Sequence, residues 1–289
     1  MSATISPHPE AAAADGLPAL RTLARVEAKR FARHPLFLLG IAIMLIPMVA
    51  VVWQQELDAN PMTGTLFIAF LIGVFGFIVA HRLTTSLLRT RDLAGTTPVS
   101  RQQRTLALCL ACLVPAAAGV VVAVFMLVTA AIWTPVGDPV TAHVAWFRDD
   151  PAIDVLATLI AMGPVAALGG PLLGVAVARW APFRGSALIG VVTLVFLTAL
   201  PGEASVPWRV LSAWPLLVDE YVNDGGGPIV RSSFVPGVEP IWVLFYLLCL
   251  CGLAVVAALL RDPGHRRPLL GAGAALTVGA VGFFLLAVS

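Results

Sequence analysis

Two acidic clusters have the residue types and the spacing that chemistry most often requires. The clusters are Asp149-Asp150-x-x-x-Asp154 and Asp219-Glu220-x-x-x-Asp224. Carboxylates grouped in this way could supply the oxygen ligands that Mg²⁺ and Ca²⁺ prefer. These clusters are the basis of one function open to this chain, an integral membrane lipid-processing enzyme. The competing interpretation, which we favour, treats both clusters as solvated loop residues that bind no metal.

Other residues that could do chemistry lack the partners they would need. Cys109-x-x-Cys112 and Cys249-x-Cys251 lie inside apolar runs, where a free cysteine behaves as a small hydrophobic residue. Lysine occurs once, at Lys29, and no glycine-rich phosphate-binding loop precedes it, so the chain has no P-loop for ATP. No Gly-x-Ser-x-Gly or His-Glu-x-x-His motif is present. We therefore expect no catalytic residue, metal ligand or cofactor in this chain.

Seven apolar runs divide most of the sequence. The runs are Leu36–Val52, Leu66–Ala80, Leu106–Ile132, Val155–Ala178, Ala187–Leu200, Ile241–Leu260 and Leu269–Val288. Each is close to the ~20 residues that a helix needs to cross ~30 Å of hydrocarbon, although the second and fifth are shorter. Only 12% of the residues are charged, whereas soluble domains carry about 25%. The sequence therefore predicts an all-α integral membrane protein with about seven transmembrane helices.

The basic residues predict how these helices are oriented. If the helices alternate in direction, one set of flanks holds all but three of the 18 lysine and arginine residues. The opposite set holds only Arg148, Arg209 and Arg231. Because loops rich in lysine and arginine stay in the cytoplasm, we expect a cytoplasmic N-terminus and a C-terminus, Ser289, outside. The expected location is the cell membrane, plasma or inner, which the chain crosses several times.

Two elements are predicted before the first run. Residues 1–16 are rich in alanine and proline and are expected to form a disordered cytoplasmic tail. Within 17–35, basic residues recur every four positions along one stripe: Arg21, Arg25, Lys29 and Arg33. Apolar residues occupy the other side, where Glu27 is the exception. We interpret 17–35 as an amphipathic elbow helix lying on membrane lipids, with 36–289 as the transmembrane domain. A solvated charged face is the alternative.

The polar segment 82–104 has the pattern of two helices separated by a break. Leucines continue a helical stripe past the second run, at Leu83, Leu87 and Leu88. Gly95 is a plausible stop, and Thr97 followed by Pro98 predicts a new helix start, because threonine can cap a helix and proline suits its first turn. The segment is either an ordinary loop whose arginines fix the topology or an element that docks a cytoplasmic partner.

This arrangement resembles the permease subunits of ATP-binding cassette (ABC) transporters of the type-2 exporter class. Those proteins begin with a basic elbow helix that leads into the first span, as 17–35 does here. Their loop between the second and third spans carries a coupling helix that sits on the ATPase, and it often ends in a turn like Thr96-Thr97-Pro98-Val99-Ser100-Arg101. The resemblance covers roughly residues 17–135. That class usually has six spans with both termini inside, whereas seven runs are present here.

The resemblance implies the transmembrane subunit of an ATP-driven exporter for a hydrophobic or amphipathic substrate. A separate cytoplasmic ABC ATPase subunit would bind ATP-Mg, and the permease would form a homodimer or a heterodimer with a second permease. The implied ATPase contacts are Leu87, Leu88, Arg89, Arg91, Asp92 and Thr97. No nucleic-acid partner is expected. The seven runs contain no Asp, Glu, Lys, Arg or His, which argues against a proton-coupled carrier.

The fourth run has the clearest helix-packing signal. Met162-Gly163-Pro164 and Gly169-Gly170-Pro171 are each expected to bend or break the helix. A face of small residues follows, which would let another helix approach closely within the subunit or across a dimer: Gly170, Gly174 and Ala178.

The longest polar stretch between runs is 201–240, which we expect to be an extracytoplasmic loop. Its residues 206–217 are apolar, contain two tryptophans and are interrupted by prolines. Because tryptophan favours the membrane interface, these residues predict a re-entrant or interfacial helix.

Overall fold

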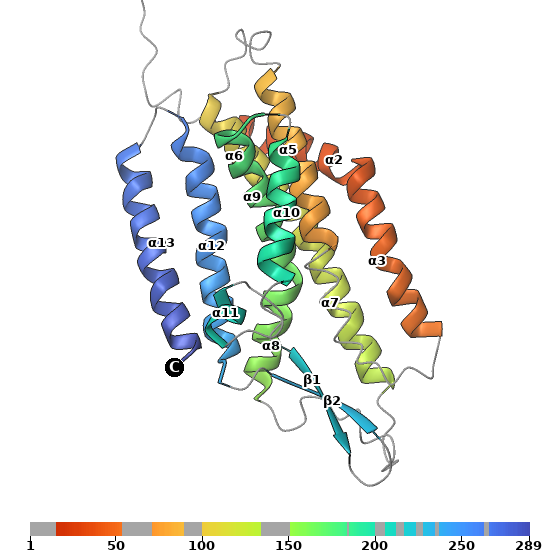
Figure 1. The fold of residues 1–289 in the computed structure, drawn as a ribbon. Helices are drawn as coiled ribbons and strands as arrows, with labels where there is room; N and C mark the ends of the chain where they lie inside the picture. The colour runs from red at the N-terminus through yellow and green to blue at the C-terminus, as the bar shows by residue number, and fades with distance from the viewer. Residues whose placement is uncertain are drawn as a thin grey trace, which may run out of the picture.

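Helices make up most of the computed structural model (Figure 1). It describes residues 16–53, 71–89, 100–133, 151–183, 185–199, 206–211, 217–223, 228–234, 237–262 and 266–289. In chain order the longer helices are α2 (Gly16–Ala32), α3 (Pro35–Trp53), α5 (Gly73–Arg89), α6 (Arg101–Ala111), α7 (Leu113–Trp133), α8 (Ala152–Ile160), α9 (Ala166–Trp180), α10 (Ser186–Ala199), α12 (Pro240–Leu260) and α13 (Arg266–Ala287). A π-helical turn, η5 (Ala161–Val165), joins α8 to α9, and α11 (Val206–Leu211) is short.

Several of these helices are long and apolar enough to span a membrane. Within the described residues four helical segments meet that length, namely Arg101–Phe125, Ala152–Trp180, Pro240–Leu260 and Arg266–Ala287. Three shorter apolar helices are Pro35–Ile46, Gly73–Leu88 and Ser186–Phe196. Each of the seven falls on one of the predicted apolar runs. The helical fold is therefore confirmed, and four of its helices are long and apolar enough to span a membrane, whereas seven complete crossings stay a prediction.

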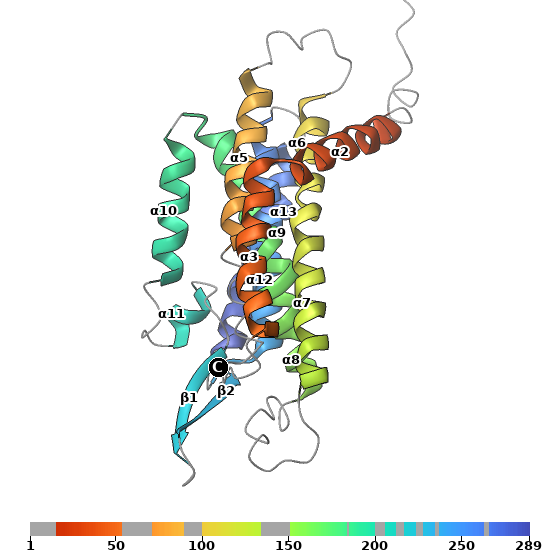
Figure 2. The same ribbon diagram turned by 90° about the vertical axis from the view of Figure 1, so that its right-hand side faces the viewer.

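The helices lie side by side in a bundle whose two ends differ (Figures 1 and 2). At one end α5, α9 and α12 terminate, α6 and α13 begin, and α2 crosses the bundle. We call it the basic end, because the flanking segments there carry most of the arginines. The opposite end holds α11 and the C-terminus. When α6 with α7 and α8 with α9 are each taken as one segment, successive segments run in alternating directions (Figure 1), which is the arrangement that the count of basic residues assumed.

Helix α2 occupies the predicted elbow position and packs through one face. Phe31 is 1% exposed and meets the ring of Phe37 edge-on, with 5.2 Å between centroids. The basic stripe is exposed to solvent. Glu27, which interrupts the apolar face in the sequence, is buried and accepts a hydrogen bond from Arg30 Nη1 at 3.0 Å. The carboxylate is thus a paired buried charge. The turn at His34 and the start of α3 at Pro35 agree with the predicted boundary.

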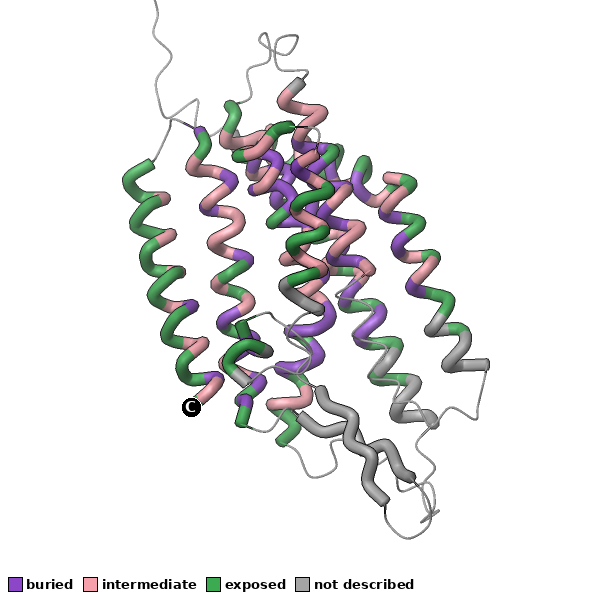
Figure 3. The backbone as a smooth tube through the Cα atoms, viewed as in Figure 1, coloured by how far each residue is buried: buried purple, intermediate pink, exposed green. Residues whose placement is uncertain are grey.

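The bundle core lies where α5 meets α9. A Cβ added at Gly170 would overlap the carbonyl oxygen of Gly73, and one added at Gly174 would overlap the carbonyl oxygen of Phe77. The backbones of the two helices are therefore in direct contact. Figure 3 shows buried residues concentrated in this central region, whereas α13 is mostly exposed and packs along α12.

The two proline motifs of the fourth apolar run differ in how they affect the helix. Pro164 lies in the π-helical turn η5, where the helix was expected to deform. Pro171 lies inside α9, which continues from Ala166 to Trp180, so the helix does not break there, and a bend at this proline stays a prediction. A helix tolerates an internal proline when neighbouring segments accommodate it. Here a Cβ at Gly76 of α5 would lie 2.6 Å from Pro171 Cγ, so only glycine leaves room for the ring.

The 201–240 segment contains strands as well as a short helix. Helix α11 covers the first half of the re-entrant helix predicted for residues 206–217. Strand β1 (Leu217–Asn223) begins at the last residue of that predicted helix. β1 pairs antiparallel with β2 (Pro228–Phe234), with Glu220 opposite Arg231. Val218, Tyr221 and Val222 in β1 favour a strand, and three glycines follow between the two strands in the sequence. The hairpin is the one exception to an all-helical description of the residues that the structure describes.

Candidate functional site at the basic end of the bundle

The predicted coupling residues lie where α5 leaves the bundle. Leu87 packs against the hydrophobic core, and Leu87 and Leu88 both line a cavity between helices. Both side chains are partly exposed, and their contact with an ATPase stays a prediction. Arg89 is the last residue of α5. Arg91, Asp92 and Thr97 lie outside the described residues.

Helix α6 begins three residues beyond the predicted start. Ser100 has an extended backbone, with ψ at 156°, and caps the helix that begins at Arg101. Gln103 N donates to Ser100 Oγ at 3.2 Å, and Ser100 N donates to Gln103 Oε1 at 3.0 Å. The start predicted at Thr97 and Pro98 is therefore wrong for α6. The Ser-x-x-Gln signature of a capping box was present in the sequence and would have placed the boundary correctly.

A buried ion pair joins three helices at this end. Arg179 of α9 donates from Nη2 to Asp262 Oδ1, just beyond α12. Thr105 of α6 donates to Asp262 Oδ2 at 3.3 Å. Asp262 is 2% exposed, and a buried carboxylate needs partners of this kind. No local sequence pattern marks the pair, because 83 positions separate Arg179 from Asp262.

Aromatic contacts reinforce the same junction between α9 and α12. Trp180 donates from Nε1 to the carbonyl oxygen of Ala257 at 2.8 Å. The guanidinium of Arg261 lies over the Trp180 ring, 5.6 Å from its centroid, at a distance that allows a cation–π interaction. The ends of α6, α9 and α12 are thus held together by side-chain bonds.

A cavity of about 520 Å³, which we call the arginine cavity, opens at this junction. Its lining comes from α5, α6, α9 and α12 and their ends: Thr84, Thr85, Leu87, Leu88, Arg101, Arg104, Thr105, Leu108, Arg179, Pro182, Arg261 and Asp262. The described part of this lining holds four arginines and one carboxylate, Asp262, which pairs with Arg179.

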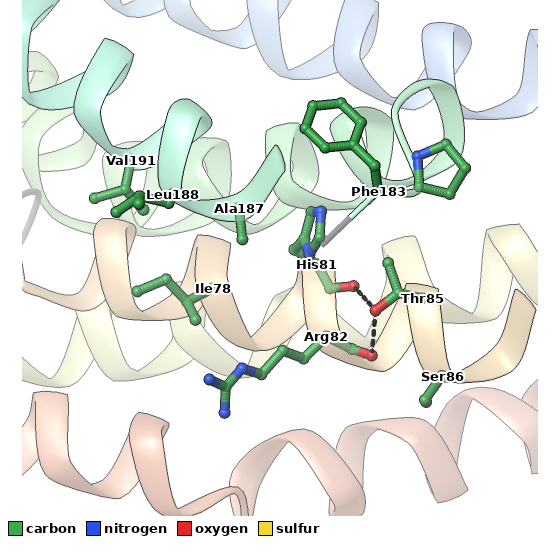
Figure 4. Close-up of a pocket in the computed structure, with 10 residues that line it drawn as sticks. Ile78, His81, Arg82, Thr85, Ser86, Phe183, Ala187, Leu188 and Val191 are labelled. Carbon is green, nitrogen blue, oxygen red and sulfur yellow. Dashed lines mark hydrogen bonds between the residues drawn. The ribbon is translucent and has the colours of Figure 1, made fainter. Parts of the chain in front are cut away.

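A second opening, the α5–α10 cleft, has a volume of about 770 Å³ (Figure 4). Its lining is Ile78, His81, Arg82, Thr85, Ser86, Pro182, Phe183, Ala187, Leu188 and Val191. His81 Nε2 and Ser186 Oγ lie 2.7 Å apart and connect the two helices. Ser186 Oγ also donates to Phe183 O at 2.8 Å. Thr85 and Pro182 also line the arginine cavity, so the two openings adjoin.

His34 lies in the turn between α2 and α3, at the basic end of the bundle. Partial burial lowers the pKa of His34, and the positive charge of Arg82 lowers it further. The imidazole is therefore neutral near pH 7. Its Nδ1 accepts a hydrogen bond from Leu36 N at 3.3 Å, which satisfies a free donor in the first turn of α3.

The acidic clusters are only partly within the described residues. Asp154 lies in the first turn of α8, and the backbones of Asp219 and Glu220 belong to β1. Asp149, Asp150 and Asp224 lie outside. No group of three His, Cys, Asp or Glu side chains that could hold a metal occurs in the part of the chain that is described. The lipid-processing alternative stays a hypothesis.

The predicted small-residue face packs inside the chain. Gly170 and Gly174 contact the α5 backbone, and Ala178 is fully buried. A second subunit cannot use these residues without displacing α5. The glycine of α5 that completes the contact, Gly73, was not singled out in the sequence, because its role depends on a partner helix about a hundred residues away.

Comparison with protein families, curated proteins and solved structures finds no match for this chain. Its function must therefore be argued from the sequence and the fold.

Proposed function

We propose that this chain is the membrane-spanning permease subunit of an ATP-driven exporter. The observation that carries the proposal is the position of α2, which crosses the bundle at the basic end and leads through His34 and Pro35 into α3 (Figure 2). A basic amphipathic helix in that position suits the cytoplasmic headgroup layer. The C-terminal end of α5 and the N-terminal end of α6 lie at this same end of the bundle, where a cytoplasmic partner would bind.

The packing of α5 supports a coupling role for that joining segment. Direct backbone contact at Gly73 and Gly170 ties α5 to α9, and the Asp262 ion pair ties α9 to α12 and α6. A displacement of residues 90–99 would therefore move several helices together. In the proposed mechanism, closure of a separate ATPase pushes on this segment through Arg89, Arg91, Asp92 and Thr97.

The remaining parts of the proposal follow from composition and charge. The ATPase subunit binds ATP-Mg, and the permease pairs with a second copy or with a sister permease. The basic end faces the cytoplasm and Ser289 lies outside. The cargo is hydrophobic or amphipathic, because the predicted spans contain no charged residue.

The proposal is tested by purifying the tagged chain from its native membrane in mild detergent. The chain should bring with it a P-loop ATPase subunit and ATP hydrolysis, and the chain separated from that subunit should hydrolyse no ATP. Arg91→Glu should reduce the recovered ATPase, whereas Arg21→Glu, which makes the same charge change on the exposed stripe of α2, should not. Hydrolysis by the isolated chain, or equal recovery with both variants, would contradict the proposal.

A further inference from the structure

The helical segment Ala152–Trp180 is continuous but changes its hydrogen bonding partway along, at η5. We infer that η5 is a hinge on which α8 moves relative to α9, so that α8 has a second position in the bundle. Helix α8 lies toward the end that holds α11, and α9 lies toward the basic end (Figure 1). The movement belongs to the chain itself and needs no ATPase partner.

The hydrogen bonding of η5 suits a hinge, because it passes over a proline. Ala166 N donates to Ala161 O, five residues back, whereas an α-helix bonds four residues back. The longer spacing accommodates Pro164, which lies inside η5 and has no N–H to donate. Sharp changes in the direction of a helix occur at prolines and at π-helical turns of this kind. The segment is therefore easiest to bend at η5.

Close packing against α7 holds η5 itself in place. A Cβ added at Gly119 of α7 would lie 2.9 Å from the carbonyl oxygen of Gly163, and one added at Gly163 would lie 3.1 Å from Ala123 Cβ. The two backbones are thus in contact, as they are where small residues let membrane helices approach closely. A hinge needs a pivot that stays still while the attached helix moves, and this contact supplies it.

The helices on the two sides of η5 are attached to the bundle differently. On the α9 side, backbone contacts with α5 and the Arg179–Asp262 pair fix the helix. Helix α8 buries a short apolar stretch with one hydroxyl, formed by Ala157, Thr158 and Leu159. Its outward-facing Ile153 is 61% exposed. Helix α8 is therefore the arm that can move, and α9 stays with the rest of the bundle.

Thr158 indicates that the described position of α8 leaves a bond unmade. The residue is 3% exposed, and its Oγ1 has no hydrogen-bond partner among the described residues. Thr84 of α5 is equally buried, yet its Oγ1 donates to Ala80 O at 2.8 Å. A buried hydroxyl without a partner is unfavourable. A second position of α8 that gives Thr158 a partner would be stabilised by that bond.

Distances between spin labels test the movement in the purified full chain, reconstituted in lipid nanodiscs. One label is attached at Leu248→Cys on α12, and the other at Ile153→Cys on α8 or at Leu173→Cys on α9; all three positions are exposed. Cys249→Ala removes the native cysteine that is not buried. Double electron–electron resonance should give two distances between positions 153 and 248, and one distance between positions 173 and 248.

Two variants should suppress the second position of α8. Deletion of Pro164 turns the five-residue spacing of η5 into the four-residue spacing of an α-helix, so one distance between positions 153 and 248 should remain. Thr158→Val replaces the hydroxyl by a methyl group. It should lower the population of the second position about fivefold, the equivalent of one hydrogen bond, without lowering thermal stability.

Thr84→Val is the matched control, because it removes a buried hydroxyl that is already bonded. It should lower thermal stability and leave the two populations unchanged. A single distance between positions 153 and 248 in the unmodified chain would overturn the inference. An equal spread of distances for both label pairs would also overturn it, because the whole bundle would then be flexible. If the chain without Pro164 fails to fold, Thr158→Val still decides, since unchanged populations in that variant contradict the proposed second position.

Discussion

Helix α5 meets α9 on one side and α10 on the other, and the two contacts differ in how closely the helices approach. Toward α9, Gly170 and Gly174 bring the backbones together. Toward α10, the helices are separated over much of their length by a cleft of about 770 Å³. The main connections on that side are the His81–Ser186 hydrogen bond and the packing of Gly190 on the Phe77 ring.

The difference separates the helices that must move as a unit from one that can move alone. Small residues permit close helix packing in membranes, where burial of apolar surface gives no advantage over lipid. The α5–α9 pair has that packing, and the polar bonds of Asp262 extend it to α6 and α12. Helix α10 lacks such close backbone packing against α5, and its apolar surface is exposed. We expect substitutions on the α9 side to unfold the protein and those on the α10 side to loosen α10.

The largest expected effect comes from breaking the ion pair that completes the closely packed side. Asp262→Ala should lower the free energy of unfolding by about 3–5 kcal/mol, because it leaves the Arg179 guanidinium buried without its partner. Equilibrium denaturation in detergent measures the change. Arg179→Met/Asp262→Leu, which removes both charges, should recover much of the loss. A double variant no more stable than Asp262→Ala would contradict the pairing.

The glycine contact between α5 and α9 should be the next most sensitive position. Gly170→Ala is expected to cost about 1–3 kcal/mol, since the added methyl group meets the Gly73 backbone, which cannot rotate away. Gly271→Ala is the control, because nothing lies within 4 Å of a Cβ there and alanine favours a helix. The same denaturation assay compares them, and similar stabilities would show that the helices are not in contact.

On the open side, Ser186→Ala should have a smaller effect of about 1 kcal/mol, from the lost His81 hydrogen bond. The more informative result is a change in α10 alone. Hydrogen exchange of α10 amides should accelerate while that of α9 stays the same. Thr193→Ala, at an exposed position of α10, should leave both rates unchanged. Faster exchange in α9 and α10 together would show that the two sides are not independent.

The smallest effect is expected far from α5, in the acidic cluster that could hold a metal. Asp150→Ala should change stability by no more than about ±0.5 kcal/mol, as for most surface residues, and should leave ATP hydrolysis by the assembled complex unaltered. If the cluster held a catalytic ion instead, loss of one ligand would abolish activity. Loss of function in well-expressed Asp150→Ala and Asp219→Ala variants would support the lipid-processing enzyme.

Local patterns in the sequence predicted the helices on both sides of α5, namely α9 and α10. They did not predict which residues of these helices contact α5. Hydrophobic runs located the helices, and the spacing of arginines located α2, because both are set by neighbouring residues. The small-residue spacing identified the α9 face and not its partner Gly73. The Arg179–Asp262 pair and the arginine cavity depend on helices far apart in sequence, so no local signal marked them.

Three features had local signals in the sequence. The Ser100–Gln103 capping box marks the start of α6 more accurately than the Thr97-Pro98 pair. The β1–β2 hairpin lies in a stretch predicted as a loop with an interfacial helix, although Val218, Tyr221 and Val222 are strand-forming residues. Glu27 interrupts an apolar face in the sequence, but Arg30, three residues later, can pair with it.

The most direct test of the proposed function asks what lies against the segment between α5 and α6. Arg91→Cys would be labelled in native membranes with a benzophenone maleimide and irradiated, with Asn223→Cys on β1 as the control at the opposite end. We predict a covalent adduct between position 91 and a P-loop ATPase, and none from position 223. Absence of the adduct at 91 when the ATPase is present, or its formation at 223, would contradict the proposed coupling.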